Sequence, residues 1–148
     1  NEGMKIAFTP LLVALAATTW AGAKPMVVVF LKATCPHTKA AIPGLNQLNT
    51  ALFSKAHFVA YVNLPAAEIN AFRKKMGAEF NISPDPDSKR TLAAGGTHSL
   101  DFALMVPGKK PQVWKGFGPK SLGELGRALG CTFKSKAYPS KLLSGCGF

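Results

Sequence analysis

The sequence predicts an α/β domain built on a mixed β-sheet, with its elements in the order β-α-β-α-β-β-α. Short apolar runs rich in β-branched and aromatic residues alternate with segments whose apolar residues recur at helical spacing. The last two strand-like runs are joined by a Pro-Gly turn and not by a helix, which indicates an antiparallel hairpin. The strand–helix–strand order before that hairpin indicates parallel pairing with a right-handed crossover, so the sheet is expected to be mixed.

The first half of the chain predicts two strand–helix units. Residues 26–31 form a continuous apolar run bounded by turn residues, which indicates a buried strand. A helix is expected from Pro36, because proline is favoured at the first helical position and apolar residues then follow at helical spacing. A second strand is predicted over 57–64, and a second helix from Pro65 to a stop at Gly77. The inward-facing helical residues are Leu45, Leu48 and Leu52, followed by Ile69, Phe72 and Met76.

The second half predicts an irregular stretch, the hairpin and a final helix. Residues 81–96 contain a cluster of Pro, Asp and Ser, which are typical turn residues. Strands are predicted over 100–106 and 112–117. Ser121 and Glu124 have the spacing of a capping box, so the last helix is expected to begin at Ser121, and Gly130 ends it. The predicted domain therefore covers residues 24–130, and residues 131–148 remain as a C-terminal tail.

Size and composition limit the classes of protein to which the chain can belong. It has 148 residues, 47% of them hydrophobic and 17% charged, which is typical of one globular domain. The formal net charge of +11 suits an anionic partner. The 18 Lys and Arg residues are scattered, however, without an aromatic RNA-binding signature or a basic recognition helix, so we expect no nucleic-acid partner. A weak attraction to anionic membrane surfaces is the remaining expectation.

The N-terminal segment has the features of an export signal. An apolar run over 6–19 follows a lysine, and Ala21, Gly22 and Ala23 supply small residues at the spacing of a signal-peptidase site. The run is short for a membrane span. We therefore predict that residues 1–23 are a signal peptide and that the protein is periplasmic or secreted. The alternative is a retained N-terminal helix that packs on the sheet.

Cys35 lies where the first strand passes into the first helix, directly before Pro36. The free N–H groups and positive dipole end of a helix favour a thiolate there, and the pKa of such a cysteine falls from about 8.5 towards roughly 3.5–7.5. We therefore predict a partly exposed catalytic Cys35, with His37 stabilising the thiolate and Thr38 hydrogen-bonding the sulfur. Thr34 and Pro36 are its expected neighbours. An inert, buried structural cysteine is the competing interpretation.

The cysteine count predicts one disulfide. The three cysteines are Cys35, Cys131 and Cys146, and an odd number in an exported chain indicates one pair and one free thiol. Cys131 and Cys146 flank the short tail, so we predict that they are paired and that Cys35 is left free. Closing a loop of that size stabilises the fold by about 3 kcal/mol in the chain-entropy model.

The strand, the Thr34-Cys35-Pro36-His37 turn and the helix after it resemble the thioredoxin-like superfamily, and within it the secreted redoxins of the AhpC/TSA and TlpA-like group. The resemblance covers about residues 24–130 and implies a thioredoxin-like three-layer α/β/α sandwich. Members usually carry Cys-x-x-Cys, and here Thr38 stands at the second position. The resemblance implies thiol–disulfide exchange or thiol-based antioxidant chemistry at a single cysteine. It also implies a thiol or disulfide substrate, an external reductant and no cofactor.

Two other functions fit parts of the same sequence. Residues 98–107 resemble the Sco family of copper chaperones, which implies a copper-binding or redox-sensing site with Cys35, His37 and His98 as ligands, since thiolate and imidazole suit copper. A non-catalytic interaction module is the third interpretation, because 96–100 lack the proline that most thioredoxin-like proteins carry before the third strand. In that fold this loop abuts the first helix, so we expect His98 close to Cys35 in every case.

Overall fold

The computed structural model describes residues 23–148, so the predicted signal peptide lies outside the described residues except for its last position. Five strands form one sheet in the order β3-β2-β1-β4-β5. The central strand β1 pairs in parallel with β2 and antiparallel with β4, which confirms the predicted α/β class with a mixed sheet. The strands are β1 (Met26–Leu31), β2 (His57–Val62), β3 (Asn81–Pro84), β4 (Phe102–Met105) and β5 (Gln112–Trp114).

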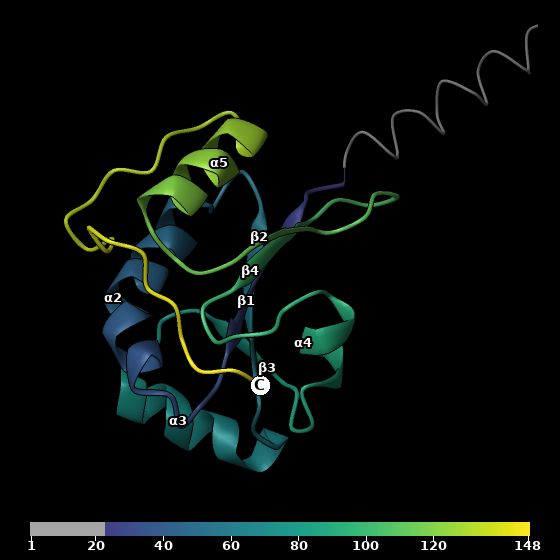
Figure 1. Cartoon of the computed structure of the whole chain (residues 1–148), viewed down its shortest axis with the longest axis vertical. Coiled ribbons are helices and arrows are strands. Elements are labelled where there is room, and N and C mark those ends of the chain that lie inside the picture. The colour runs from purple at the N-terminus through teal and green to yellow at the C-terminus, as the bar shows by residue number, and fades with distance from the viewer. Residues whose placement is uncertain (1–22) are drawn as a thin grey trace, which may run out of the picture.

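The helices cover the two faces of the sheet unequally (Figure 1). Helices α2, α3 and α5 pack on one face, and the short α4 lies on the other, so the domain has three layers. None of the helices within residues 23–148 has the length and apolar character that crossing a membrane requires. The helices are α2 (Pro36–Ala51), the short 3-10 helix η1 (Ala66–Glu68), α3 (Ile69–Met76), α4 (Lys89–Ala93) and α5 (Pro119–Leu129).

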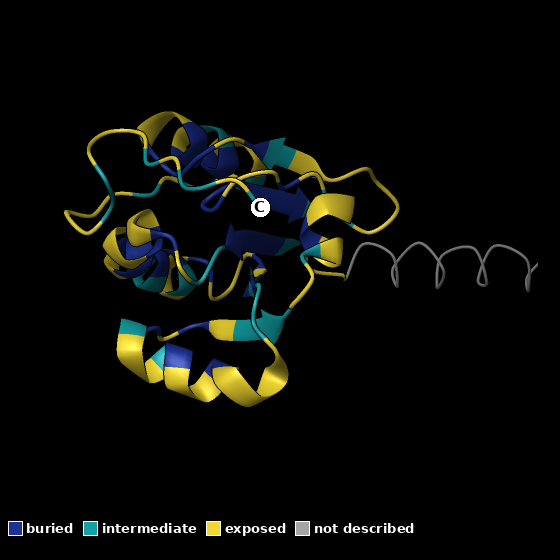
Figure 2. Cartoon of the chain, turned by 60° about the horizontal axis from the view of Figure 1, so that its bottom comes forward, coloured by how far each residue is buried: buried dark blue, intermediate teal, exposed yellow. Residues whose placement is uncertain are grey.

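Strand β1 is buried on both sides, which explains its continuous apolar sequence. Val27, Val29 and Leu31 join the core beneath α2, whereas Val28 and Phe30 face the side of α4. Figure 2 shows the buried strands enclosed between helices whose outer surfaces are exposed. Because β1 is fixed in this way, the turn after Leu31 and the start of α2 are held at one end of a rigid sheet.

The structure adds an edge strand to the predicted order of elements. Residues 81–84 pair in parallel with β2 as β3, although we expected irregular structure there. This strand has only four residues and ends at Pro84, so it carries no alternating pattern that could reveal it.

Helix α5 begins at Pro119, two residues before the expected start. The reason is that Gly118 is the N-cap residue, and its N–H donates to the Ser121 hydroxyl (3.0 Å).

Asp85 is a buried carboxylate that holds the start of α4. It accepts hydrogen bonds from the N–H of Arg90 (3.1 Å), the N–H of Thr91 (2.8 Å) and the Thr91 hydroxyl (2.7 Å). Burial by itself raises the pKa of Asp85, but the bonds from Thr91 and Arg90 and the Arg90 charge outweigh it and lower that pKa below 3.8. Asp85 therefore stabilises the fold above about pH 4, and this contribution is lost as the pH falls through the lowered pKa.

We expect Asp85→Asn to lower the free energy of unfolding at pH 7 by roughly 1–3 kcal/mol, because buried N–H groups lose a charged acceptor. The difference between wild type and variant should shrink as the pH falls below about 4 and through the lowered pKa of Asp85, because the wild-type carboxylate then becomes protonated as well. Urea unfolding over this pH series measures it. A difference that stays constant down to the lowest pH would contradict the assignment.

Candidate active site

Cys35 is the N-cap residue of α2, and Pro36 opens the helix as predicted. Its backbone is extended, and its N–H donates to the Lys32 carbonyl (3.1 Å) while its own carbonyl accepts the Thr38 N–H (3.1 Å). These bonds hold the sulfur at the helix N-terminus, where negative charge on sulfur is stabilised. The side chain is only 3% exposed, however, so the prediction of a partly exposed thiolate is wrong for this state of the protein.

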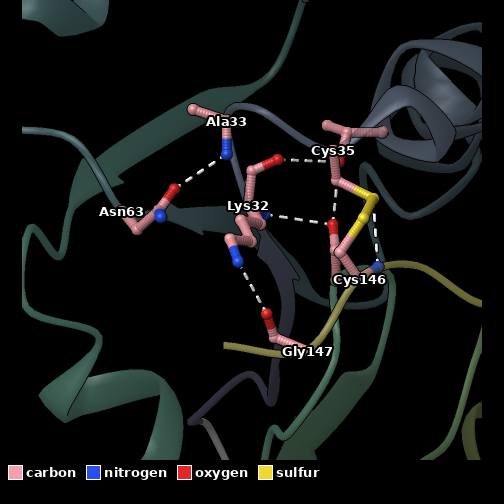
Figure 3. The surroundings of a disulfide bond; sticks show 8 residues. Lys32, Ala33, Cys35, Asn63, Cys146 and Gly147 are labelled. Atoms are coloured by element: carbon pink, nitrogen blue, oxygen red, sulfur yellow. Dashed lines mark hydrogen bonds between the residues drawn. A yellow bond between two sulfur atoms is a disulfide. The ribbon is translucent and has the colours of Figure 1, made fainter.

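Cys35 forms a disulfide with Cys146, and the two Cα atoms lie 5.8 Å apart (Figure 3). This separation is ordinary for a disulfide. Cys131 is free and half-buried. The predicted Cys131–Cys146 pair is therefore wrong, and Cys35 is not the unpaired cysteine. Proximity in sequence was a poor guide because loop-closure entropy grows only slowly with loop length, so a separation of 111 residues is no obstacle once the fold brings both ends together.

Backbone hydrogen bonds lay the end of the tail against the segment just before β4. His98 and Gly147 form an antiparallel bridge, so the last residues of the chain run as a short extended strand beside residues 97–99. This pairing sets Cys146 opposite Cys35. Its bonds run from Gly145 N–H to Ser99 O (2.9 Å), from Ser99 N–H to Cys146 O (2.8 Å) and from Phe148 N–H to Thr97 O (3.0 Å).

Two further hydrogen bonds hold the end of the tail beside Cys35. The N–H of Cys146 donates to Cys35 Sγ (3.0 Å), and Lys32 Nζ donates to the Gly147 carbonyl (2.8 Å), as Figure 3 shows. Upstream, Phe117 and Leu143 exchange a pair of backbone hydrogen bonds of 2.8 Å each. The tail is thus fastened before and after Cys146. An outside molecule can reach Cys35 only when the tail moves away.

Thr38, which stands where a Cys-x-x-Cys protein has its second cysteine, is fully buried but bonds to oxygen atoms. Its hydroxyl donates to the Lys32 carbonyl (3.0 Å), so the bond to the Ser99 hydroxyl (2.8 Å) has Ser99 as its donor. Ser99 Oγ also accepts the Lys32 N–H (3.0 Å). The predicted bond from Thr38 to the sulfur is therefore replaced by a network that ties the start of α2 to the segment that receives the tail.

The remaining predicted neighbours lie at the surface. Thr34, Pro36 and His37 are exposed in the turn and the first turn of α2, and the hydrogen bonds within residues 23–148 include none between the His37 ring and Cys35. His98 is exposed, and its Nδ1 lies 2.9 Å from the Thr97 hydroxyl. Its backbone pairs with Gly147, the residue after Cys146, so the loop containing His98 lies beside the disulfide-bonded end of the tail.

The alternative copper site is not assembled in this disulfide-bonded state. Within residues 23–148, no group of three or more His, Cys, Asp and Glu side chains has an arrangement that could hold a metal ion. Cys35, His37 and His98, the ligands of the alternative, are thus not brought together. The sulfur that copper would need is bonded to Cys146.

Cys131 lies in a groove of about 740 Å³ between α5 and the first half of the tail. The groove also contains Tyr138, whose buried hydroxyl has no hydrogen-bond partner within the described part of the chain. Burial raises the pKa of Tyr138, and the nearby Cys131 raises it further. The free cysteine is therefore placed on a different part of the domain from the Cys35–Cys146 disulfide.

Sequence reasoning missed the residues that receive the tail. Ser99 contributes its hydroxyl, N–H and carbonyl, and Lys32 contributes its N–H, carbonyl and ammonium group. Asn63 Oδ1 accepts the Ala33 N–H (2.7 Å) and steadies the same turn (Figure 3). The only sequence signal was the small Gly-Cys-Gly end of the tail, because glycines allow two backbones to approach closely.

No family model matches the chain, and no curated protein matches it in sequence. Several solved structures are similar to it in fold. DsbF of Mycobacterium tuberculosis, in mixed oxidized and reduced forms, has a TM-score of 0.58 and 23% identity over 72% of this chain and 79% of that chain. A putative thiol:disulfide interchange protein DsbE from Chlorobium tepidum has a TM-score of 0.57 and 18% identity over 70% and 76%.

A third similar structure belongs to a protein with a different activity. The Bacterioferritin Comigratory Protein of Xanthomonas campestris, which has alkyl peroxide reduction activity, has a TM-score of 0.50 and 17% identity, covering 62% of this chain and 68% of that one. At these identities the similarities show the fold alone. They confirm the predicted thioredoxin-like three-layer arrangement.

Proposed function

We propose that the protein is an exported thiol–disulfide oxidoreductase in which Cys35 attacks the substrate and Cys146 is the resolving cysteine. The observation that carries the proposal is the Cys35–Cys146 disulfide at the N-terminus of α2. The fold similarity to thiol–disulfide proteins supports the same chemistry. The proposal replaces the single-cysteine cycle expected from the sequence, because the tail supplies the second thiol that position 38 lacks.

The chemical cycle balances with a dithiol protein and a disulfide substrate. The Cys35 thiolate attacks one sulfur of the substrate disulfide, forms a mixed disulfide and releases the first substrate thiolate. The Cys146 thiolate then attacks Cys35 Sγ, releases the second substrate thiolate and forms the Cys35–Cys146 disulfide. The substrate gains two electrons and the protein loses two. An external dithiol returns the protein to its reduced form by the reverse exchange.

The surrounding residues favour both steps of this cycle. The free N–H groups at the start of α2 stabilise the Cys35 thiolate, which is the attacking form in the first step, and they make Cys35 a good leaving group when the external dithiol displaces it in the reverse exchange. Residues 97–99 guide Cys146 to the sulfur by backbone pairing, so the resolving thiol arrives in a defined position. Lys32 adds a bond from its ammonium group to the Gly147 carbonyl.

An oxidising compartment suits this chemistry. Disulfides persist in the periplasm and outside the cell, whereas cytosolic thiols are kept reduced. We therefore infer that the protein acts after export, in agreement with the expected signal peptide. Intact-mass analysis of protein exported by its native host tests the inference, and the expected mature chain starts at Lys24. A mature chain that retains the apolar run over 6–19 would refute it.

Removal of Cys146 is expected to trap the first step. In a Cys131→Ser background, Cys146→Ser protein should accumulate a mixed disulfide on Cys35 when it is mixed with glutathione disulfide, because no thiol remains to resolve it. The reduced Cys131→Ser protein should instead proceed to the Cys35–Cys146 disulfide. Intact mass and non-reducing peptide mapping distinguish the two products.

Two outcomes would count against the proposal. If the Cys146→Ser protein carries no adduct on Cys35, Cys35 is not the attacking thiol. If the adduct is resolved as fast as with Cys146 present, the tail is not the resolving element. The Cys131→Ser variant is the matched control, since it removes the free cysteine and leaves the disulfide pair intact.

A further inference from the structure

Asp101 is a buried carboxylate beside the segment that receives the tail. Its side chain is 1% exposed and belongs to the first residue after the turn at Leu100. Its Oδ2 accepts the Thr97 N–H (3.0 Å), the His98 N–H (3.0 Å) and the Thr97 hydroxyl (3.2 Å). One carboxylate oxygen therefore fixes the two residues that precede Ser99.

The same carboxylate also binds the connection between β5 and α5. Its Oδ1 accepts the Gly116 N–H (3.0 Å), and Lys115 Nζ lies 3.3 Å from Oδ2. Lys115 Nζ in addition donates to the Thr97 hydroxyl (2.9 Å) and to the Gly95 carbonyl (2.9 Å). Asp101 thus lies at the centre of a network that joins the loop before β4 to the loop after β5. Phe117, which pairs with Leu143 of the tail, follows directly.

The backbone at this position is strained. Leu100 has a φ of +78°, a left-handed conformation that costs of order 1–3 kcal/mol for a residue other than glycine. The side chain of Leu100 is fully buried, and its N–H donates to the Phe30 carbonyl (2.7 Å). The sharp turn directs Ser99 towards Cys146. A strained turn persists only when its surroundings hold it, and the Asp101 carboxylate does so from the inside.

We propose that Asp101 is a positioning residue that pre-organises residues 97–99 for the tail and thereby sets how readily Cys35 and Cys146 form their disulfide. The inference rests on the proposed function and adds a residue that influences the redox equilibrium of its two cysteines. Asp101 acts through Thr97 and His98, whose neighbour Ser99 makes two backbone bonds to the tail. A segment that is ordered beforehand lowers the cost of tail docking, and docking favours the oxidised protein.

Asparagine at this position keeps the size of the side chain but replaces an acceptor oxygen by an N–H₂ group. The carboxylate accepts four hydrogen bonds from N–H and O–H groups in addition to the Lys115 ammonium contact. An amide cannot satisfy all of these donors, because it presents two donor hydrogens of its own. Asp101→Asn should therefore loosen residues 97–98 without leaving a cavity.

The test is the equilibrium between the disulfide and a glutathione redox buffer, measured on the full chain in a Cys131→Ser background. We expect Asp101→Asn to shift the equilibrium constant towards the reduced protein by about tenfold, as expected when hydrogen bonds to a charged group are lost. Hydrogen exchange of the Ser99 and Phe148 amides in the oxidised protein should become faster as well.

Asp85→Asn is the matched control. Asp85 is equally buried and also holds a loop through backbone N–H groups, but it binds the start of α4 and not the tail-receiving segment. We expect it to lower overall stability without moving the redox equilibrium, because it destabilises the oxidised and reduced folds alike. Equal shifts in both variants, or no shift in Asp101→Asn, would overturn the proposal.

Lys115→Met covers the case in which Asp101→Asn fails to fold. The Lys115 side chain is 58% exposed, so its removal weakens the same network from the outside. It should shift the equilibrium in the same direction by a smaller factor, and an unchanged equilibrium would count against the proposal.

A different result would refute the proposed function itself, namely that the tail of the wild-type protein does not resolve a mixed disulfide on Cys35. A working exchange cycle with no shift in these variants would reject only the role of Asp101.

Discussion

Reduction of the Cys35–Cys146 disulfide is expected to lower the free energy of unfolding by roughly 2–5 kcal/mol. The bond closes a loop with a separation of 111 residues, so it constrains most of the described chain in the unfolded state. It also holds the C-terminal tail, whose last residues Gly147 and Phe148 would otherwise be fastened by single bonds. For a domain of this size, such a change is a large part of the total stability.

Urea unfolding of the Cys131→Ser protein, oxidised and reduced, measures the difference. The substitution removes the free cysteine, so disulfide exchange with it cannot occur. It also distinguishes the Cys35–Cys146 pairing from the predicted Cys131–Cys146 pairing. If Cys131 and Cys146 were paired in solution, as the sequence alone predicted, Cys131→Ser protein would carry no native disulfide and reduction would not change its stability. The double variant Cys35→Ser and Cys146→Ser should unfold like the reduced protein.

Alanine at Gly145 is expected to expel the end of the tail. A Cβ there would lie 2.5 Å from the Ser99 carbonyl oxygen and 2.6 Å from Ser99 Cβ, and neither the backbone nor the buried side chain of Ser99 can move aside cheaply. The tail must shift and lose its bonds to Ser99, at about 0.5–1.5 kcal/mol each. We therefore expect the equilibrium constant for reduction of the disulfide to rise about tenfold in Gly145→Ala, because two hydrogen bonds that hold the tail are lost.

Gly147→Ala is the matched control in the same tail. Apart from its own residue and the two residues next to it in the chain, a Cβ at this position would lie no closer than 3.8 Å to any heavy atom, with the His98 ring as its nearest neighbour. This variant should keep the wild-type redox equilibrium. The measurement is equilibration with reduced and oxidised glutathione, followed by alkylation and mass analysis. Equal behaviour of the two variants would show that the tail is not docked on Ser99 in solution.

The local sequence determined the scaffold that carries Cys35. The apolar run of β1, the position of Pro36 and the leucine spacing of α2 were each readable from a few neighbouring residues. The α/β class followed from the order of such segments. Short segments such as β3 were not readable, because four residues at a sheet edge take their conformation from the neighbouring strand and not from their own pattern.

Only the tertiary structure decided which cysteines meet. The apolar residues of the tail after α5 follow no helical or alternating pattern, so its own sequence does not predict where it runs. Its course depends on backbone groups of residues 97–99, which the turn at Leu100 and the Asp101 carboxylate expose towards Cys35. Backbone pairing carries almost no sequence signature, since every residue except proline has the same N–H and carbonyl groups. For this reason the sequence could predict a reactive role for Cys35, whereas its disulfide partner Cys146 became evident only from the fold.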